Sequence, residues 1–136
     1  MDSEELTRLT VVEAASHIAK KTISPVDLLD AYLKRIERLE PTLNAFISRL
    51  DSYAMEKAKI AEKEIIAGDY RGPMHGIPIG VKDLFWTKDI PTSSGSILEA
   101  NFVPKEDSAA VASFQKAGSY CLGKLHMSEF AFNGTS

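Results

Sequence analysis

Hydrophobic positions in the first third of the chain recur at the spacing of an α-helix. Between residues 25 and 38 the apolar side chains fall three or four positions apart, and charged side chains occupy most of the positions between them. Ser24 can cap this helix, Pro25 suits its first position, and Asp27 adds a favourable negative charge to the first turn. The pattern therefore predicts a helix that packs one face against the rest of the protein. Its apolar positions are Leu29, Tyr32, Leu33 and Ile36.

Two further helices are predicted on either side of this one. A capping-box pattern begins at Thr10 and precedes a predicted helix over residues 14–21. Asp51 can cap a third helix that stops at Gly68, and the narrow apolar stripe of this helix is typical of a surface helix packed on a larger body. The short apolar stretch over residues 44–50 could be either helix or strand.

Strand patterns appear only after the third helix. Glycines and prolines alternate there with apolar residues, which predicts a loop that leads into a buried strand ending near Lys82. A helix is predicted from Asp107 or Ser108 to Lys116, followed by a second apolar strand over residues 119–125. Strand, helix and strand in this order indicate parallel strands joined by a helical crossover, so the predicted fold class is α/β.

These patterns predict an N-terminal helical segment over residues 1–70 and the first part of an α/β core over residues 71–136. Two strands make a poor sheet, because sheets typically contain about five or six strands and a parallel sheet needs both faces covered. Turn-forming residues 133–136 follow with no further element. We therefore expect both segments to belong to one larger domain, whose mixed or parallel sheet is only begun here.

Composition narrows the class of protein. The chain has 16 Lys and Arg against 19 Asp and Glu, a formal net charge of -3, and its basic residues are mixed with acidic ones, so direct nucleic-acid binding is not expected. The acidic N-terminus is unlike a secretory signal, and no apolar run approaches the roughly 20 residues that span a membrane. A cytoplasmic protein is predicted. Cys121 has apolar neighbours and is predicted to be a core residue.

Three motifs resemble known sites but lack essential parts of them. Residues 118–124 match GxxxxGK, yet the following Leu125 has no hydroxyl group to bind magnesium. The serine-rich residues 93–96 lack the preceding glycine of a nucleophile elbow and predict a polar turn. His126 and Glu129 could share a helical face, but a metal site needs three or four converging ligands. We therefore expect neither a metal nor a cofactor.

An ordered set of short motifs extends over nearly the whole chain. The motifs are Ile23-Ser-Pro-Val-Asp-Leu28, Leu43-Asn-Ala-Phe46, Gly76-Ile-Pro-Ile-Gly-Val-Lys-Asp83, Pro91-Thr-Ser-Ser-Gly-Ser96, Asp107-Ser-Ala-Ala-Val111, Ala117-Gly118, Leu122-Gly-Lys124 and Met127-Ser-Glu-Phe-Ala131. In order and approximate spacing they resemble the amidase signature family. One such fragment would be a weak signal, whereas the ordered set is specific.

This resemblance implies a serine hydrolase that cleaves carboxylic amides with a Ser, cis-Ser, Lys triad. By position Lys82 matches the lysine of the triad, and the two serines and the oxyanion-hole amides are expected outside this chain. In the family scheme the neutral lysine draws a proton, through the middle serine, from the nucleophilic serine, which then forms an acyl-enzyme. Without the surrounding motifs, Lys82 would be read as an ordinary lysine with a packed stem and a solvated amine.

A catalytic role places a physical demand on this lysine. An ordinary lysine has a pKa near 10.4, so a neutral amine at pH 7 requires that pKa to fall by roughly 3 units. Burial can supply such a shift, and we therefore expect covering layers over Lys82. Asp83 would keep the amine charged if it faced it, but strand alternation sends the two side chains to opposite faces.

The resemblance also bears on the substrate. It implies that Ala131 and Phe132 line the acyl pocket, although both could equally be core residues. Leu125 and His126 stand where many family members have a Thr-Asn pair, a departure that concerns substrate choice rather than reaction class.

Three functions remain open at this point. The first is an amidase acting on small-molecule or peptide amides, with this chain as its N-terminal part. The second is the A subunit of glutamyl-tRNA(Gln) amidotransferase, a glutaminase that supplies ammonia to partner subunits. The third is a noncatalytic α/β fragment or relic. The chain alone is expected to be inactive because a lysine without a nucleophile and oxyanion donors cannot complete the reaction. Homo-oligomerisation is left open.

Overall fold

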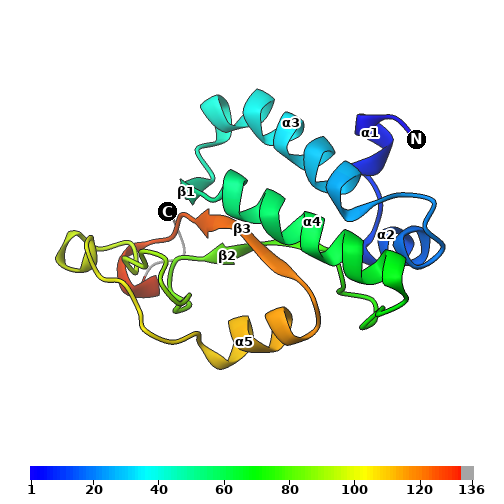
Figure 1. The fold of residues 1–136 in the computed structure, drawn as a ribbon. Coiled ribbons are helices and arrows are strands. Elements are labelled where there is room, and N and C mark those ends of the chain that lie inside the picture. The colour runs from blue at the N-terminus through cyan, green and yellow to red at the C-terminus, as the bar shows by residue number, and fades with distance from the viewer. Residues whose placement is uncertain (133–136) are drawn as a thin grey trace.

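The computed structural model describes residues 1–132, and the predicted terminal turn over residues 133–136 lies outside this part. Helices dominate the first half of the chain, and the strands lie mostly in the second half (Figure 1). The elements in chain order are α1 Ser3–Leu6, α2 Val11–Ala19, α3 Pro25–Leu43, β1 Phe46–Arg49, α4 Asp51–Ala67, β2 Pro78–Lys82, the 3-10 turn η1 Ile97–Glu99, α5 Ala109–Lys116, β3 Tyr120–Leu125 and the 3-10 turn η2 Glu129–Ala131.

The predicted caps of α2 and α3 are confirmed by their hydrogen bonds, although α2 runs over Val11–Ala19 rather than over the predicted residues 14–21. The Thr10 hydroxyl accepts from the Glu13 backbone N–H at 3.2 Å, and the Glu13 carboxylate accepts from the Thr10 N–H at 2.8 Å. Ser24 caps α3 in the same way, with Pro25 at the first helical position. Such caps satisfy backbone donors that have no partner inside the helix.

The start of α4 differs from the prediction. Its N-cap is Leu50, with no side-chain cap, whereas Asp51 is the first helical residue. The Asp51 carboxylate binds Arg49 instead, with Arg49 Nε donating at 3.1 Å. The predicted end at Gly68 is confirmed, since this glycine adopts a left-handed conformation at the C-cap.

The short stretch of ambiguous type forms strand β1. It pairs antiparallel with β3, while β2 pairs parallel with β3 as predicted, so the described sheet has the order β1-β3-β2. The predicted α/β class is thereby confirmed as a mixed sheet with helices. The division of the chain near residue 70 stays a prediction.

Helices cover both faces of the sheet (Figure 1). On one face α3 and α4 pack against β3, whereas α5 packs on the other face through Val111, Val81 and Cys121. Cys121 is buried as predicted, and burial raises the pKa of its thiol. The contacts between α3, α4 and β3 involve Leu29, Ala54, Ala58, Tyr120 and Leu122.

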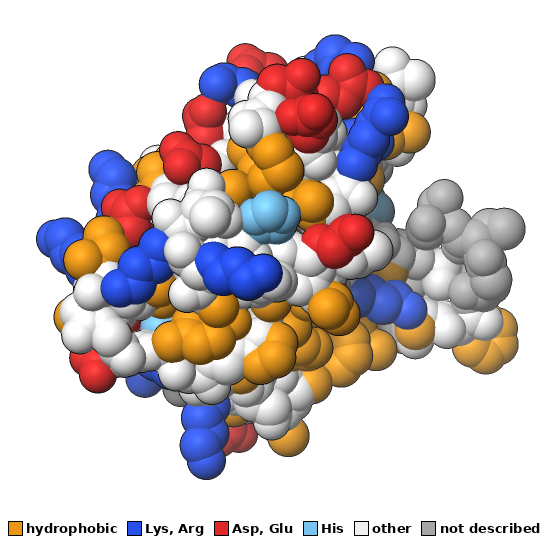
Figure 2. Space-filling model, turned by 90° about the vertical axis from the view of Figure 1, so that its right-hand side faces the viewer, with side chains coloured by type: hydrophobic (Ala, Val, Ile, Leu, Met, Phe, Trp, Pro, Cys, Tyr) orange, Lys and Arg blue, Asp and Glu red, His pale blue; other side chains and the backbone are white. Residues whose placement is uncertain are grey.

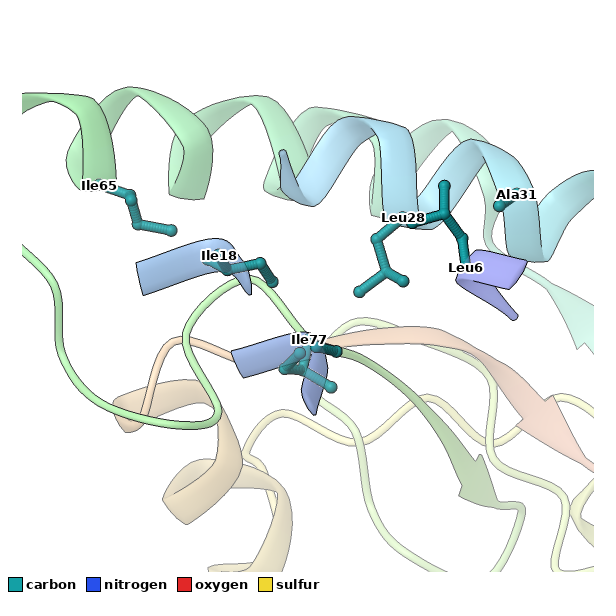
Figure 3. Close-up of a cluster of buried hydrophobic side chains, with 7 residues drawn as sticks. Leu6, Ile18, Leu28, Ala31, Ile65 and Ile77 are labelled. Carbon is teal, nitrogen blue, oxygen red and sulfur yellow. The ribbon is translucent and has the colours of Figure 1, made fainter. Parts of the chain in front are cut away.

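A second apolar cluster joins the N-terminal helices to the segment before β2. Side chains from α1, α2, α3 and α4 converge on Ile77 (Figure 3). Leu6 belongs to α1, a four-residue helix that the sequence patterns did not predict and that Asp2 caps. The cluster contains Leu6, Ala14, Ile18, Leu28, Ala31, Ile65 and Ile77.

Charged side chains are mixed on the molecular surface. On the face shown in Figure 2, basic and acidic side chains lie among one another, and hydrophobic side chains gather mainly in the lower half. That face offers no continuous basic surface of the kind that binds nucleic acid. Within residues 1–132, no helix has both the length and the apolar character needed to cross a membrane.

A buried histidine is packed directly against a glycine turn. His75 Nδ1 accepts from the Arg71 N–H at 3.1 Å, so Nε2 carries the proton and donates to Glu64 at 2.9 Å. A Cβ atom at Gly118 would lie 2.5 Å from His75 Cδ2. Because both ring nitrogens are hydrogen-bonded, a shift of the imidazole away from Gly118 would strain or break these bonds.

We expect Gly118→Ala to lower the free energy of unfolding by about 2–4 kcal/mol, because it adds steric overlap to left-handed strain. Gly68→Ala is the matched control: Gly68 also has a positive φ, +100° against +89°, but nothing lies within 4 Å of its Cβ position. That control should cost about 1 kcal/mol, the strain alone. Urea unfolding measures both, and equal losses would contradict the packing argument.

Candidate active site

Lys82 is the last residue of β2, at the carboxyl end of a parallel strand. The neighbouring Val81 and Asp83 are buried, whereas the Lys82 side chain is exposed. This difference in exposure agrees with the alternation expected of a strand. The carboxyl ends of strands in α/β sheets are where ligands commonly bind, so Lys82 lies where the sequence analysis placed it.

An apolar cavity of about 190 Å³ adjoins Lys82. Its walls come from β2, from the loop after it and from α5. Lys82 itself is open to solvent, so residues 1–132 do not provide the burial that a neutral amine requires. The lining residues are Ile79, Gly80, Val81, Lys82, Phe85, Ala110, Val111 and Phe114.

Asp83, the residue after Lys82, is held by hydrogen bonds of both its side chain and its backbone. Its side chain is 1% exposed, and Oδ2 accepts from the Ser93 N–H at 2.9 Å and from the Ser93 hydroxyl at 2.6 Å. Its backbone N–H donates to the Leu125 carbonyl, and its carbonyl accepts from the Ser94 N–H. Asp83 thus ties the end of β2 to β3 and to the serine-rich turn.

A second lysine lies inside the protein beside Asp83. Lys124 on β3 has 0% exposure, and its Nζ lies 3.6 Å from Asp83 Oδ1. The amine donates to the Phe85 carbonyl at 2.7 Å, to Thr87 Oγ1 at 3.1 Å and to Thr92 Oγ1 at 2.8 Å. Burial lowers the pKa of Lys124, and the Asp83 carboxylate opposes that change.

The sequence analysis did not identify Lys124 as a site residue. It appeared in the family motif Leu122-Gly-Lys124, without a role, and as the lysine of the GxxxxGK match, whose final residues form strand β3 rather than a phosphate-binding loop. A usable signal was present in Tyr120-Cys-Leu-Gly-Lys-Leu125, an otherwise apolar strand. A lysine in such a strand needs buried acceptors, because an isolated buried charge is very costly.

The serine-rich residues 93–96 form the predicted polar turn, with Ser94 and Gly95 at positive φ. The turn holds the segment that follows β3: the Ser94 carbonyl accepts from the Phe130 N–H at 2.8 Å, and the Ser96 hydroxyl donates to Glu129 at 2.7 Å.

The two predicted substrate-binding residues lie next to this turn. Ala131 has a positive φ, and the Phe132 side chain is 92% exposed. Neither residue lines the cavity beside Lys82. Their role therefore stays a prediction. Glu129, considered above as a partner of His126 in a metal site, binds Ser96 instead. Residues 1–132 contain no group of three or more potential ligands placed to hold a metal ion.

Relatives of this chain include an amidase and an amidotransferase subunit. The provisionally named amidase AmiD of Mycobacterium bovis is 36% identical over 134 residues, which are 98% of this chain and 28% of that protein. The A subunit of glutamyl-tRNA(Gln) amidotransferase from Methylococcus capsulatus is 41% identical over 129 residues, covering 95% of this chain and 26% of the subunit. The chain thus spans little more than a quarter of the length of these relatives.

The fold matches solved structures as well. The peptide amidase from Stenotrophomonas maltophilia superposes with a TM-score of 0.85 and 31% sequence identity, covering 94% of this chain and 27% of that one. The family model described as Amidase matches residues 27–136, which include β2, Lys82, Asp83 and Lys124. The chain therefore belongs to the amidase, or amidase signature, family.

Proposed function

We propose that Lys82 is the base of a Ser, cis-Ser, Lys triad in a longer amidase to which this chain contributes. The observation that carries the proposal is the place of Lys82, at the carboxyl end of β2 and beside an apolar cavity, in a chain of the amidase family. Residues outside the 136 present supply the two serines and the oxyanion-hole amides. They also cover Lys82, so that its amine is neutral when substrate binds.

The proposed reaction is acyl transfer to a serine followed by hydrolysis. The neutral Lys82 amine takes a proton from the middle serine, which takes one from the nucleophilic serine as that serine attacks the amide carbonyl. Lys82 then returns the proton through the middle serine to the nitrogen of the substrate, which leaves as ammonia or an amine. Water finally hydrolyses the acyl group from the nucleophilic serine. Within this chain, the fixed backbone of Asp83 holds the end of β2, and therefore the start of the Lys82 side chain, in one position.

The substrate we favour is a small-molecule or peptide amide, with Ala131 and Phe132 beside its acyl group. The similarity to a peptide amidase supports this choice. The similarity to an amidotransferase A subunit supports glutamine as the second candidate, with partner subunits to receive the ammonia. A noncatalytic relic is the third candidate, and the loss of catalysis in a Lys82 variant would exclude it.

In the full-length protein, Lys82→Ala should lower kcat/KM for amide hydrolysis by about a hundred- to ten-thousand-fold, the usual contribution of a general base. Ammonia release from a series of amides measures the effect. Lys88→Ala is the control, because Lys88 is an exposed lysine of the loop that follows. Activity within a few-fold of the parent in the Lys82 variant would refute the assigned role.

The choice of substrate can be tested without any partner. We expect the purified full-length protein to hydrolyse simple amides and amidated peptides in the absence of other subunits or tRNA. Steady-state ammonia release, compared between glutamine and an amidated dipeptide, gives the measurement. Turnover of glutamine alone, and only after partner subunits are added, would favour the amidotransferase function.

The 136-residue chain alone should show no amide turnover, since the proposed nucleophile and oxyanion donors lie outside it. Prolonged incubation at high protein concentration with product detection by mass spectrometry provides a sensitive check. Turnover that Lys82→Ala abolishes would show that the nucleophile lies within these residues, and the assignment of the triad would then be wrong.

A further inference from the structure

We propose that Lys124 is a positioning residue for the amidase reaction: its buried ammonium neutralises Asp83, so that the carboxylate next to Lys82 does not hold the Lys82 amine in its charged form. The inference rests on the proposed function of Lys82. It assigns different tasks to the two lysines of this region, a permanent charge to Lys124 and a transferable proton to Lys82.

The hydrogen bonds around Lys124 require the charged amine. The Thr87 hydroxyl donates to the Phe85 carbonyl, and the Thr92 hydroxyl donates to the Ile90 carbonyl, each at 3.1 Å. Both hydroxyl oxygens therefore act as acceptors towards Lys124, as does the Phe85 carbonyl. Three acceptors face Nζ, whereas a neutral amine has only two N–H groups. Lys124 therefore has the three N–H groups of an ammonium, one for each acceptor.

Asp83 is the counter-charge of this ammonium. Its Oδ2 is occupied by the two donors of Ser93, whereas its Oδ1 is buried and has no hydrogen-bond partner among residues 1–132. The ammonium of Lys124 lies 3.6 Å from that oxygen. The titratable groups that act on Lys124 are Asp83 and the Cys121 thiol, whose pKa is raised by burial, so Asp83 supplies the compensating negative charge.

This pairing matters for Lys82 because Asp83 directly follows it. The two side chains lie on opposite faces of the strand, but an uncompensated buried carboxylate on the adjacent residue would still favour a charged Lys82, since a nearby opposite charge stabilises the charged form. Paired with Lys124, the carboxylate contributes no net charge and still accepts the two hydrogen bonds of Ser93, while the backbone of Asp83 remains bound to Leu125 and Ser94. Asp83 thus fixes the end of β2 through its hydrogen bonds without raising the pKa of Lys82 in the proposed site.

The test is the pH profile of kcat/KM in the full-length protein, whose acid limb reports the protonation of the base. Lys124→Met leaves Asp83 uncompensated and should move the acid limb to higher pH by about one unit, at the low end of the shift that a nearby opposite charge causes. Asp83→Asn leaves a bare cation and should move the limb to lower pH. The double variant should return the limb to that of the parent.

Thr92→Val provides a matched structural control. It removes one acceptor of Lys124 and alters no charge, so it can lower kcat/KM without moving the limb. If Lys124→Met does not fold, Asp83→Asn carries the test. A limb that moves to lower pH in Asp83→Asn supports the proposal. A limb that stays in place in Asp83→Asn, or that moves equally in Thr92→Val, overturns it.

The failure of this inference can be told apart from failure of the proposed function. If Lys82→Ala keeps its activity, Lys82 is not the base and the proposed function is wrong. If Lys82→Ala abolishes activity while the acid limb is indifferent to the charges at Lys124 and Asp83, the proposed function stands and the positioning role of Lys124 is wrong.

Discussion

Each N–H group of a buried lysine ammonium needs a hydrogen-bond acceptor, and in this protein the buried lysine lies on the central strand, β3. Lys124 extends from β3 into the interior, where its side chain is out of reach of bulk solvent. The chain after β2 supplies the acceptors by folding back over the strand end, which brings Phe85, Thr87 and Thr92 to one amine. The path of the loop beside Lys82 therefore depends on the buried ammonium of Lys124.

Local signals predicted α2, α3, α4 and α5, the caps of α2 and α3 and the end of α4. Thr10 and Ser24 cap because their hydroxyls accept from backbone N–H groups only three residues away. Gly68 ends α4 because a left-handed residue is needed there. The parallel pair β2 and β3 was also predicted, since a strand, a helix and a second strand leave few arrangements. The caps and helix ends depend on neighbours in sequence, and the strand pairing follows from the order of the elements.

Other features, which depend on particular contacts between distant side chains or strands, could not be predicted. Strand β1 is four residues long and becomes a strand only because β3 offers it a free edge. Asp51 has the chemistry of an N-cap but binds Arg49. The acceptors of Lys124 lie more than thirty positions earlier in the chain. For Lys82, the catalytic role came from the family resemblance. Within residues 1–132 its side chain is exposed, so the burial that this role requires has to come from other residues.

The pairing of β1 with β3 has a consequence for biosynthesis. Phe46 and Leu125 are partners in the sheet although most of the chain separates them. On the ribosome, α3, α4 and β1 emerge long before the strand that covers their apolar faces. Closing so long a loop is also slow, because its entropic cost precedes the contacts that repay it. The nascent N-terminal helices must therefore stay soluble with an open apolar face, and this interval is when chaperones would find them.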